Sequence, residues 1–308
     1  MNARRRVFLV AGAALLLGPA GPAPAKDEPD KTKTIRVLLI DGQNNHDWRS
    51  TSPWLKKVLE EGGRFKVDVS SNLRPGDKPG RIADTVPFPP DLSRYDVLVS
   101  NFNGELWPAR FRRELESRLR AGKVALVIVH AANNSFPDWP EYNRMIGLGW
   151  RDSSFGDRLY VDAAGKEVRV PKGQGPGAGH GAKHAFTVTV RDAQHPITRG
   201  MPHEWLHMPD ELYHGQRGPA EHMHLLATAY SDPAKGGTGA HEPMIWTLTY
   251  GKGRVFHTPM GHDTEAMRCK GFQATLERGT EWAATGRVTL RLPKDFPTAE
   301  KTSAVSER

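Results

Sequence analysis

Cysteine is almost absent from this chain, which has Cys269 alone among 308 residues. A single thiol cannot form an intramolecular disulfide, and it excludes the cysteine-rich zinc and iron–sulfur sites that need several thiolates. Cys269 lies where we expect a helix to begin, whereas a reactive cysteine needs an electropositive, partly exposed setting. We therefore expect a buried or inert thiol.

Motifs for nucleotides and nucleic acids are also missing. The 43 basic and 35 acidic residues give a net charge of 43 − 35 = +8, and no basic run is interleaved with aromatic residues. A nucleic-acid partner is therefore not expected. The chain has no phosphate loop, no G-x-G-x-x-G after its first strand and no H-E-x-x-H. Nucleotide cofactors are unsupported, and any metal site must be built from dispersed residues.

The sequence has no apolar run long enough for a membrane helix, which needs about 20 residues. Its longest, residues 7–17, follows three arginines at 4–6 and precedes Ala23-Pro24-Ala25, the pattern of a cleaved signal peptide over residues 1–25. Arg5-Arg6 also fits a twin-arginine signal, and the Sec route stays open. We expect an exported protein, periplasmic or secreted, with no membrane span and a mature charge of 40 − 35 = +5.

The remaining sequence predicts one α/β domain over residues 34–290, preceded by a disordered lead-in at 26–33 and followed by a mobile tail at 291–308. In the first half, apolar strand-like runs alternate with helices, which indicates a parallel sheet covered on both faces. One helix should have Thr51 or Ser52 as its cap and Pro53 at its first position. The predicted strands are 34–40, 65–69, 95–100 and 124–129; the helices are 53–61 and 110–120; a long loop spans 71–92.

The second half is less regular. Residues 150–183 are rich in glycine and predict a long insertion or flap. Strands are expected at 186–190 and 225–230, a β-hairpin at 244–257, and a closing helix at 264–284.

Histidine and acidic side chains stand after several of these strands. Ligands bind beyond the carboxyl ends of strands in open α/β sheets, so polar residues at those ends are candidates for a site. Asp41, His46 and Asp47 follow the first predicted strand, and Asn103 follows the third. His130 and Asn133 follow the fourth strand, and His262 follows the hairpin. Asp210 and Glu211 lie in a polar stretch of their own. The structural alternatives are a core histidine for His130, a helix cap for Asp210 and a simple turn at Gly261.

His130 occupies the position of the nucleophile in related α/β enzymes. The turn reads His-Ala-Ala-Asn, without a serine, a cysteine or a G-x-S-x-G motif, so acyl-enzyme chemistry loses support. An active glutamine amidotransferase would need Cys269 as its nucleophile, at a sharp turn between a strand and a helix. We expect Cys269 at the start of a helix, which argues against this activity.

Taken together, several motifs make roughly residues 35–286 similar to the ThuA-like (trehalose utilisation) family. They are Gly42 with His46-Asp47-Trp48, Val129-His130-Ala131-Ala132, Trp139 with Tyr142 and Ile146-Gly147, His195-Pro196-Ile197, Asp210-Glu211-Leu212-Tyr213, and Trp246 with Tyr250, Arg254-Val255-Phe256 and Gly261-His262. The resemblance implies a three-layer, flavodoxin-like fold similar to class I glutamine amidotransferases, without the cysteine nucleophile. It also implies a link to the catabolism of trehalose-like or 3-keto sugars. The Gly-rich insertion and the export signal depart from a plain cytosolic member.

These observations favour an enzyme, a sugar isomerase, lyase or hydrolase rather than a glutaminase, that removes a proton next to a carbonyl. Glu211 or Asp210 would be the general base, with His130 and His262 polarising the substrate or shuttling protons. A divalent metal held by His46, His262 and a carboxylate is a variant. Asn103, Asn133, Tyr213 and Trp48 are candidates for binding a small carbohydrate.

The alternative is a non-catalytic carbohydrate-binding protein on the same fold, with Trp48, Trp107, Trp139, Trp150 or Trp205 stacking on sugar rings. An enzyme should gather His130, Glu211 and His262 within a few ångströms, whereas a binder needs only an aromatic groove. The substrate, the metal and the oligomeric state, including a homo-oligomer, are left open.

Overall fold

The computed structural model describes residues 33–306, so the expected signal peptide and residues 26–32 of the lead-in lie outside the described part. The main sheet runs in the order β2-β1-β3-β4-β14-β13-β12-β8-β9. Its first five strands are parallel and the rest antiparallel. These strands are β1 (Ile35–Asp41), β2 (Phe65–Ser71), β3 (Val97–Ser100), β4 (Ala125–Val129), β14 (Gly253–Thr258), β13 (His241–Tyr250), β12 (Met223–Tyr230), β8 (Thr187–Val190) and β9 (Glu204–Leu206).

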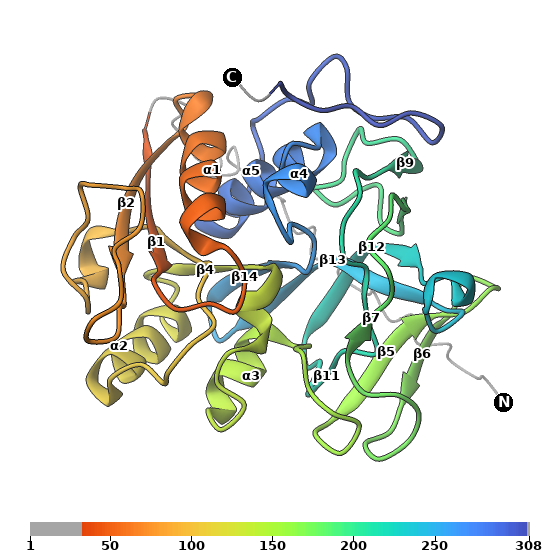
Figure 1. Ribbon diagram of the computed structural model, residues 1–308, viewed down its shortest axis with the longest axis horizontal. Coiled ribbons are helices and arrows are strands. Elements are labelled where there is room, and N and C mark those ends of the chain that lie inside the picture. The colour runs from red at the N-terminus through yellow and green to blue at the C-terminus, as the bar shows by residue number, and fades with distance from the viewer. Residues whose placement is uncertain (1–32, 307–308) are drawn as a thin grey trace, which may run out of the picture. The chain divides into compact units, whose positions relative to one another are not determined.

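Helices cover both faces of the parallel strands, as the continuous apolar runs predict (Figure 1). Successive side chains of β1 alternate between two cores: Val37 and Leu39 face one, Leu38 and Ile40 the other. The first core lies under α1 (Trp48–Glu61), α4 (Thr264–Met267) and α5 (Lys270–Thr285), the second under α2 (Ala109–Arg120) and α3 (Pro140–Ile146). The prediction of an α/β fold with a parallel-rich sheet and flanking helices is confirmed.

The first helix begins earlier than predicted. Asp47 caps it by accepting a hydrogen bond from the backbone N–H of Ser50, so Pro53 lies inside the helix rather than at its first position. Thr51 and Ser52 are also residue types that commonly cap helices. The Asp47 carboxylate precedes them in the chain and accepts the Ser50 N–H, which has no partner within the helix. The prediction of Thr51 or Ser52 as the cap was wrong.

The closing helix is interrupted. Helix α4 ends at Met267, Cys269 has an extended backbone, and α5 starts at Lys270. The end of the chain fills the break: Cys269 forms a β-bridge with Ala304, and the Lys270 N–H donates to the carbonyl of Ser303. The sequence predicted a mobile tail over 291–308, whereas its described part packs against this break and against β9.

The Gly-rich stretch at 150–183 contains strands. Two of them, β5 (Asp157–Val161) and β6 (Glu167–Val170), pair as a hairpin beside β13 and β11 (Arg217–Gly218). A third, β7 (Gly179–His180), pairs with β10 (Tyr213–His214). Short 3-10 turns complete the chain at Leu92–Arg94, His130–Asn134 and Pro233–Lys235. The expectation of an irregular flap is replaced by a segment hydrogen-bonded to the rest of the domain.

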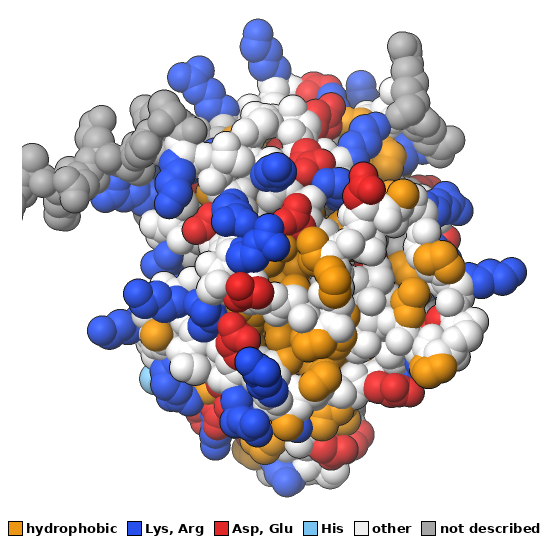
Figure 2. All heavy atoms as spheres, turned by 90° about the vertical axis from the view of Figure 1, so that its left-hand side faces the viewer, with side chains coloured by type: hydrophobic (Ala, Val, Ile, Leu, Met, Phe, Trp, Pro, Cys, Tyr) orange, Lys and Arg blue, Asp and Glu red, His pale blue; other side chains and the backbone are white. Residues whose placement is uncertain are grey.

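The predicted long loop at 71–92 lies along β2, the edge strand. The N–H of Val86 donates to the carbonyl of Val69, so part of the exposed edge is paired. Figure 2 shows this side of the molecule, where apolar side chains gather near the centre among basic and acidic ones. Among residues 33–306, none of the helices has the length and apolar character that a membrane span needs.

Candidate functional site

His130 lies at a strained turn directly after β4. Its φ is 44°, a left-handed conformation that residues other than glycine rarely adopt, and this strain is typical of functional elbows. Its Nδ1 lies 2.7 Å from the carbonyl of Pro259. Burial lowers the pKa of His130 to about 4. The ring is therefore neutral near pH 7, with the proton on Nδ1 and a lone pair on Nε2.

His46 stands in the loop that follows β1. The loop turns at Gly42, where φ is 115° and a Cβ would lie 2.5 Å from the Asn72 carbonyl oxygen, so only glycine fits. The Nδ1 of His46 lies 3.2 and 3.1 Å from the side-chain oxygens of Asn44 and Asn45. These acceptors fix the proton on Nδ1 and again leave the lone pair on Nε2.

His262 follows β14 at a second forced turn. Gly261 has a φ of 100°, and a Cβ there would come within 2.8 Å of the Phe272 ring. The Nδ1 of His262 lies 3.2 Å from the Asp263 carboxylate. This hydrogen bond, with the nearby Glu211 carboxylate, raises the pKa of His262 although burial opposes the change.

Asp210 and Glu211 have different positions. The buried Asp210 carboxylate accepts four hydrogen bonds: from His207 Nε2 and from the N–H groups of Glu211, Gly261 and His262, at 2.7–3.1 Å. With every oxygen occupied, Asp210 holds the neighbouring backbones and cannot readily accept a further proton. The prediction that Asp210 could serve as the general base does not fit this geometry. Glu211 faces the histidines.

Four side chains thus meet beyond the carboxyl ends of the strands. His46, His130, His262 and Glu211 each offer one metal-binding atom, and these atoms lie within 4.8 Å of one another. The Nε2 atoms of His46 and His130 are 3.3 Å apart, and His262 Nε2 lies 3.3 Å from Glu211 Oε1. Burial alone would raise the pKa of Glu211, but the neighbouring histidines lower it overall. Glu211 is therefore a carboxylate at neutral pH.

These separations suit a shared cation. Two nitrogen ligands, each about 2.1 Å from one zinc ion at a tetrahedral angle, lie about 3.4 Å apart. His130 Nε2 faces both His46 Nε2, at 3.3 Å, and the Tyr213 hydroxyl, at 3.0 Å, and a cation shared with His46 would be a favourable partner for the first of these contacts. Each Nδ1 is bound to an oxygen, the arrangement that orients metal-binding histidines.

Two further residues reach the cluster. The hydroxyl of Tyr213, a predicted substrate-binding residue, lies 3.0 Å from His130 Nε2, and burial raises the pKa of this phenol. His180, which the sequence patterns do not single out, has its Nε2 3.6 Å from Glu211 Oε1. Its Gly-rich surroundings carry no periodic signal, and only the pairing of β7 with β10 brings it to the site.

The other predicted residues lie outside the cluster. Asn103 does not contact the cluster directly. It donates to the side chain of Asn45, which in turn contacts His46. Asn133 is fully buried and bonds to Gln216, so it has no access to a substrate. Trp48 is buried as well, against Arg49 and the loop at 78–80. Substrate contacts for Asn133 and Trp48 stay predictions that burial disfavours: the end of β4 does not fix the direction of the Asn133 side chain, and Trp48 packs inward at the start of α1.

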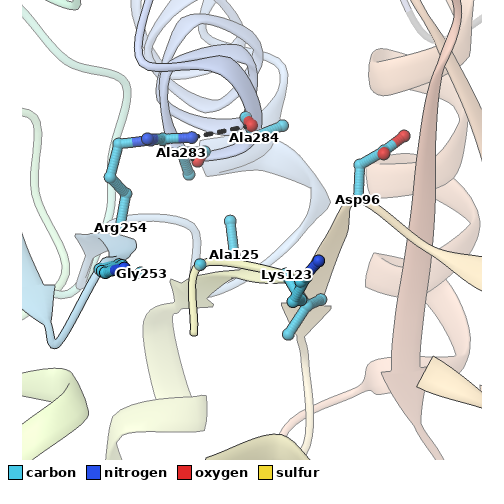
Figure 3. Close-up of a pocket in the computed structure, with 10 residues that line it drawn as sticks. Asp96, Lys123, Ala125, Gly253, Arg254, Ala283 and Ala284 are labelled. Atoms are coloured by element: carbon cyan, nitrogen blue, oxygen red, sulfur yellow. Dashed lines mark hydrogen bonds between the residues drawn. The ribbon is translucent and has the colours of Figure 1, made fainter. Parts of the chain in front are cut away.

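A small cavity lies at the opposite, amino-terminal edge of the strands (Figure 3). Its volume is about 100 Å³, far below the several hundred Å³ typical of ligand sites. Arg254 borders it and donates to the carbonyls of Ala283 and Ala284 at the end of α5, as basic residues commonly do at helix termini. This cavity is part of the packing of α5 on the sheet.

The fold and the cluster define a class: an α/β protein with a parallel-rich sheet whose strained turn after β4 carries a histidine. Cys269 is buried at the start of α5, away from that turn. The chain belongs to the ThuA (trehalose utilisation) family, whose sequence profile matches residues 36–283.

Solved structures agree with this assignment. A protein from Parabacteroides merdae described as ThuA-like is 42% identical, with a TM-score of 0.80 over 89% of this chain and 98% of that one. A second, from Bacteroides uniformis, is 16% identical with a TM-score of 0.53 over 91% of this chain and 100% of that one, and supports the fold alone. No curated protein matches the chain.

Proposed function

We propose that this protein is a divalent-metal-dependent enzyme of carbohydrate catabolism that acts on a trehalose-like or 3-keto sugar as an isomerase, lyase or hydrolase. One observation carries the proposal: three imidazole Nε2 atoms and the Glu211 carboxylate converge within 4.8 Å. Imidazole with a carboxylate suits first-row ions such as zinc, iron or nickel, and manganese where oxygen ligands contribute. The family's link to trehalose utilisation supports a sugar as the substrate.

When bound, the ion supplies a positive charge that polarises a carbonyl or lowers the pKa of water. The protein's own groups do the rest. Glu211 Oε2 faces His46 and His130 at 3.9 and 3.8 Å, while Oε1 faces His262 and His180 at 3.3 and 3.6 Å. One oxygen can therefore bind the ion while Oε1 accepts a proton. His262 would hold the ion through Nε2 while its Nδ1 stays bound to Asp263, so Glu211 Oε1 both takes up the proton and returns it.

The gathering of the cluster favours an enzyme over a simple binding protein. A carbohydrate binder needs an aromatic groove, and it gains nothing from a carboxylate and three oriented histidines. Buried and half-buried polar groups of this kind are costly unless they serve a ligand or each other. We also propose that the protein is exported, on the signal at residues 1–25.

Metal analysis of the purified protein, followed by a screen of trehalose and 3-keto-disaccharides for turnover, tests the proposal. We expect about one divalent ion per chain. The double variant Glu211→Gln, His262→Ala should lose the ion and at least 100-fold of the turnover. Glu221→Gln, His224→Ala is the matched control, because both residues are exposed and lie at the start of β12, at the other edge of the sheet. Unchanged turnover in the first variant would sink the catalytic role.

A further inference from the structure

Three aromatic rings form a wall beside the cluster. The Trp150 ring lies 4.6 Å from that of Tyr213, and the His180 ring lies 6.2 Å from Tyr213 in a stacked arrangement with an interplanar angle of 25°. Trp150 and His180 are 5.8 Å apart. The Tyr213 hydroxyl lies 3.0 Å from His130 Nε2, so this aromatic wall directly adjoins the cluster of metal-binding atoms.

Trp150 differs from the other tryptophans. Five of the eight are buried: Trp48, Trp107, Trp139, Trp205 and Trp246. Trp54 and Trp282 are partly exposed, but the first donates to the Met267 carbonyl and the second packs on His195, both on other elements. Trp150 is the partly exposed tryptophan that stands beside the candidate site. A partly exposed indole has an apolar face to offer to a ligand.

His180 directs one ring nitrogen toward the Glu211 carboxylate. Its Nδ1 donates to the carbonyl of Gly181 at 2.7 Å, so Nε2 is the ring nitrogen left for a ligand. That atom lies 3.6 Å from Glu211 Oε1, too far for a hydrogen bond, and the side chain is 38% exposed. A sugar hydroxyl placed between these two polar atoms can hydrogen-bond to both. His180 is not among the four residues whose metal-binding atoms converge.

We propose that Trp150 and His180 form a subsite that binds one sugar ring of the substrate, with the apolar face of the ring on the indole and a hydroxyl donating to His180 Nε2. The inference rests on the proposed function and names which part of the chain recognises the carbohydrate. Aromatic surface with few, well-placed polar groups is the usual lining of a small-molecule site. Both residues belong to the segment at 150–180, while the four metal-binding residues come from elsewhere.

Tryptophan fluorescence tests the subsite without relying on turnover. Metal-loaded full-length protein is titrated with trehalose and 3-keto-trehalose, and with sorbitol as an open-chain polyol that has no ring face. We expect both disaccharides to quench the fluorescence and sorbitol to have no effect. Trp150→Phe should lose the quenching, whereas Trp282→Phe should keep it. In isothermal titration calorimetry, which needs no tryptophan signal, Trp150→Ala and His180→Gln should raise the Kd at least tenfold while the metal content stays as in the wild type.

The outcomes separate the two proposals. If Trp150→Ala and His180→Gln bind the disaccharides as tightly as the wild type, or if the wild type binds neither, the subsite is refuted. If Trp150→Ala does not fold, Trp150→Phe and His180→Gln still decide the question. If sugar binding depends on these residues but the protein holds no metal and turns nothing over, the subsite stands and the proposed enzymatic function falls.

Discussion

Asp210→Asn should destabilise the protein and loosen its metal site together. In the structure, the Asp210 carboxylate accepts hydrogen bonds from His207, Glu211, Gly261 and His262. An asparagine has one oxygen, which can keep one pair of these bonds. Its amide N–H₂ then faces the other pair of donors. Glu211 and His262 are both candidate ligands, so their backbones lose a common support.

The magnitude follows from the two orphaned donors. Each buried N–H left without a partner costs about 1–3 kcal/mol. The free energy of unfolding should therefore fall by about 4 kcal/mol, and the Tm by roughly 8–16 °C for a domain of this size. Displacement of supporting groups around metal ligands typically lowers affinity by about 10–100-fold.

Thermal unfolding and metal titration of the same preparations provide the assay. Asp192→Asn is the matched control, because Asp192 also accepts backbone N–H groups, those of Gln194 and His195, but on the surface. It should cost no more than about 1 kcal/mol. If Asp210→Asn were as stable as the wild type, held its ion and yet turned over no substrate, our reasoning would be refuted and Asp210 would be the general base.

Three other expectations concern the ion, the pH and the leader. Removal of the metal with a chelator should lower the Tm, and an ion at 1,000 times its Kd should restore about 4 kcal/mol; an unchanged Tm would contradict the site. Burial lowers the pKa of His130 to about 4 and that of His257 to about 3. The unfolded chain then takes up protons first, so stability is full above pH 6.5 and falls as the pH drops toward 4. Between pH 7.5 and 5.0, denaturation should show His257→Gln losing about 2 kcal/mol less than the wild type; an equal loss would contradict the assignment. Mass spectrometry of the exported protein should find Lys26 as its first residue. If the double variant Arg5→Lys, Arg6→Lys is no longer exported, the route is twin-arginine rather than Sec.

Sequence patterns predicted the frame of the molecule because its strands are buried on both faces. Continuous apolar runs such as residues 124–129 admit few other interpretations, and the residue after such a run must lie at the sheet edge. That rule led to His130, and polar stretches beside other strands led to His46, Glu211 and His262. The structure brings these four together, while their chemical roles stay predictions.

The rest depended on contacts between distant segments. His180 reaches the site through two residues of β7, a pairing too short to leave a periodic pattern. The break at Cys269 is filled by residues 303–305, more than thirty positions along the chain. Asp210 and Glu211 are adjacent and chemically alike, and only the surrounding N–H groups distinguish a support from a ligand.

The segment at 150–180 carries the residues proposed to recognise the sugar, and the residues proposed to bind the metal lie outside it. The segment joins the domain through pairings of β5 and β7 and, at its start, through Arg151, whose guanidinium donates to the carbonyls of Asn133, Asn134 and Ser135 at the end of the turn that carries His130. Exchanging the side chains of Trp150 and His180 while Arg151 is kept should therefore alter which sugar is accepted without disturbing how the ion is held.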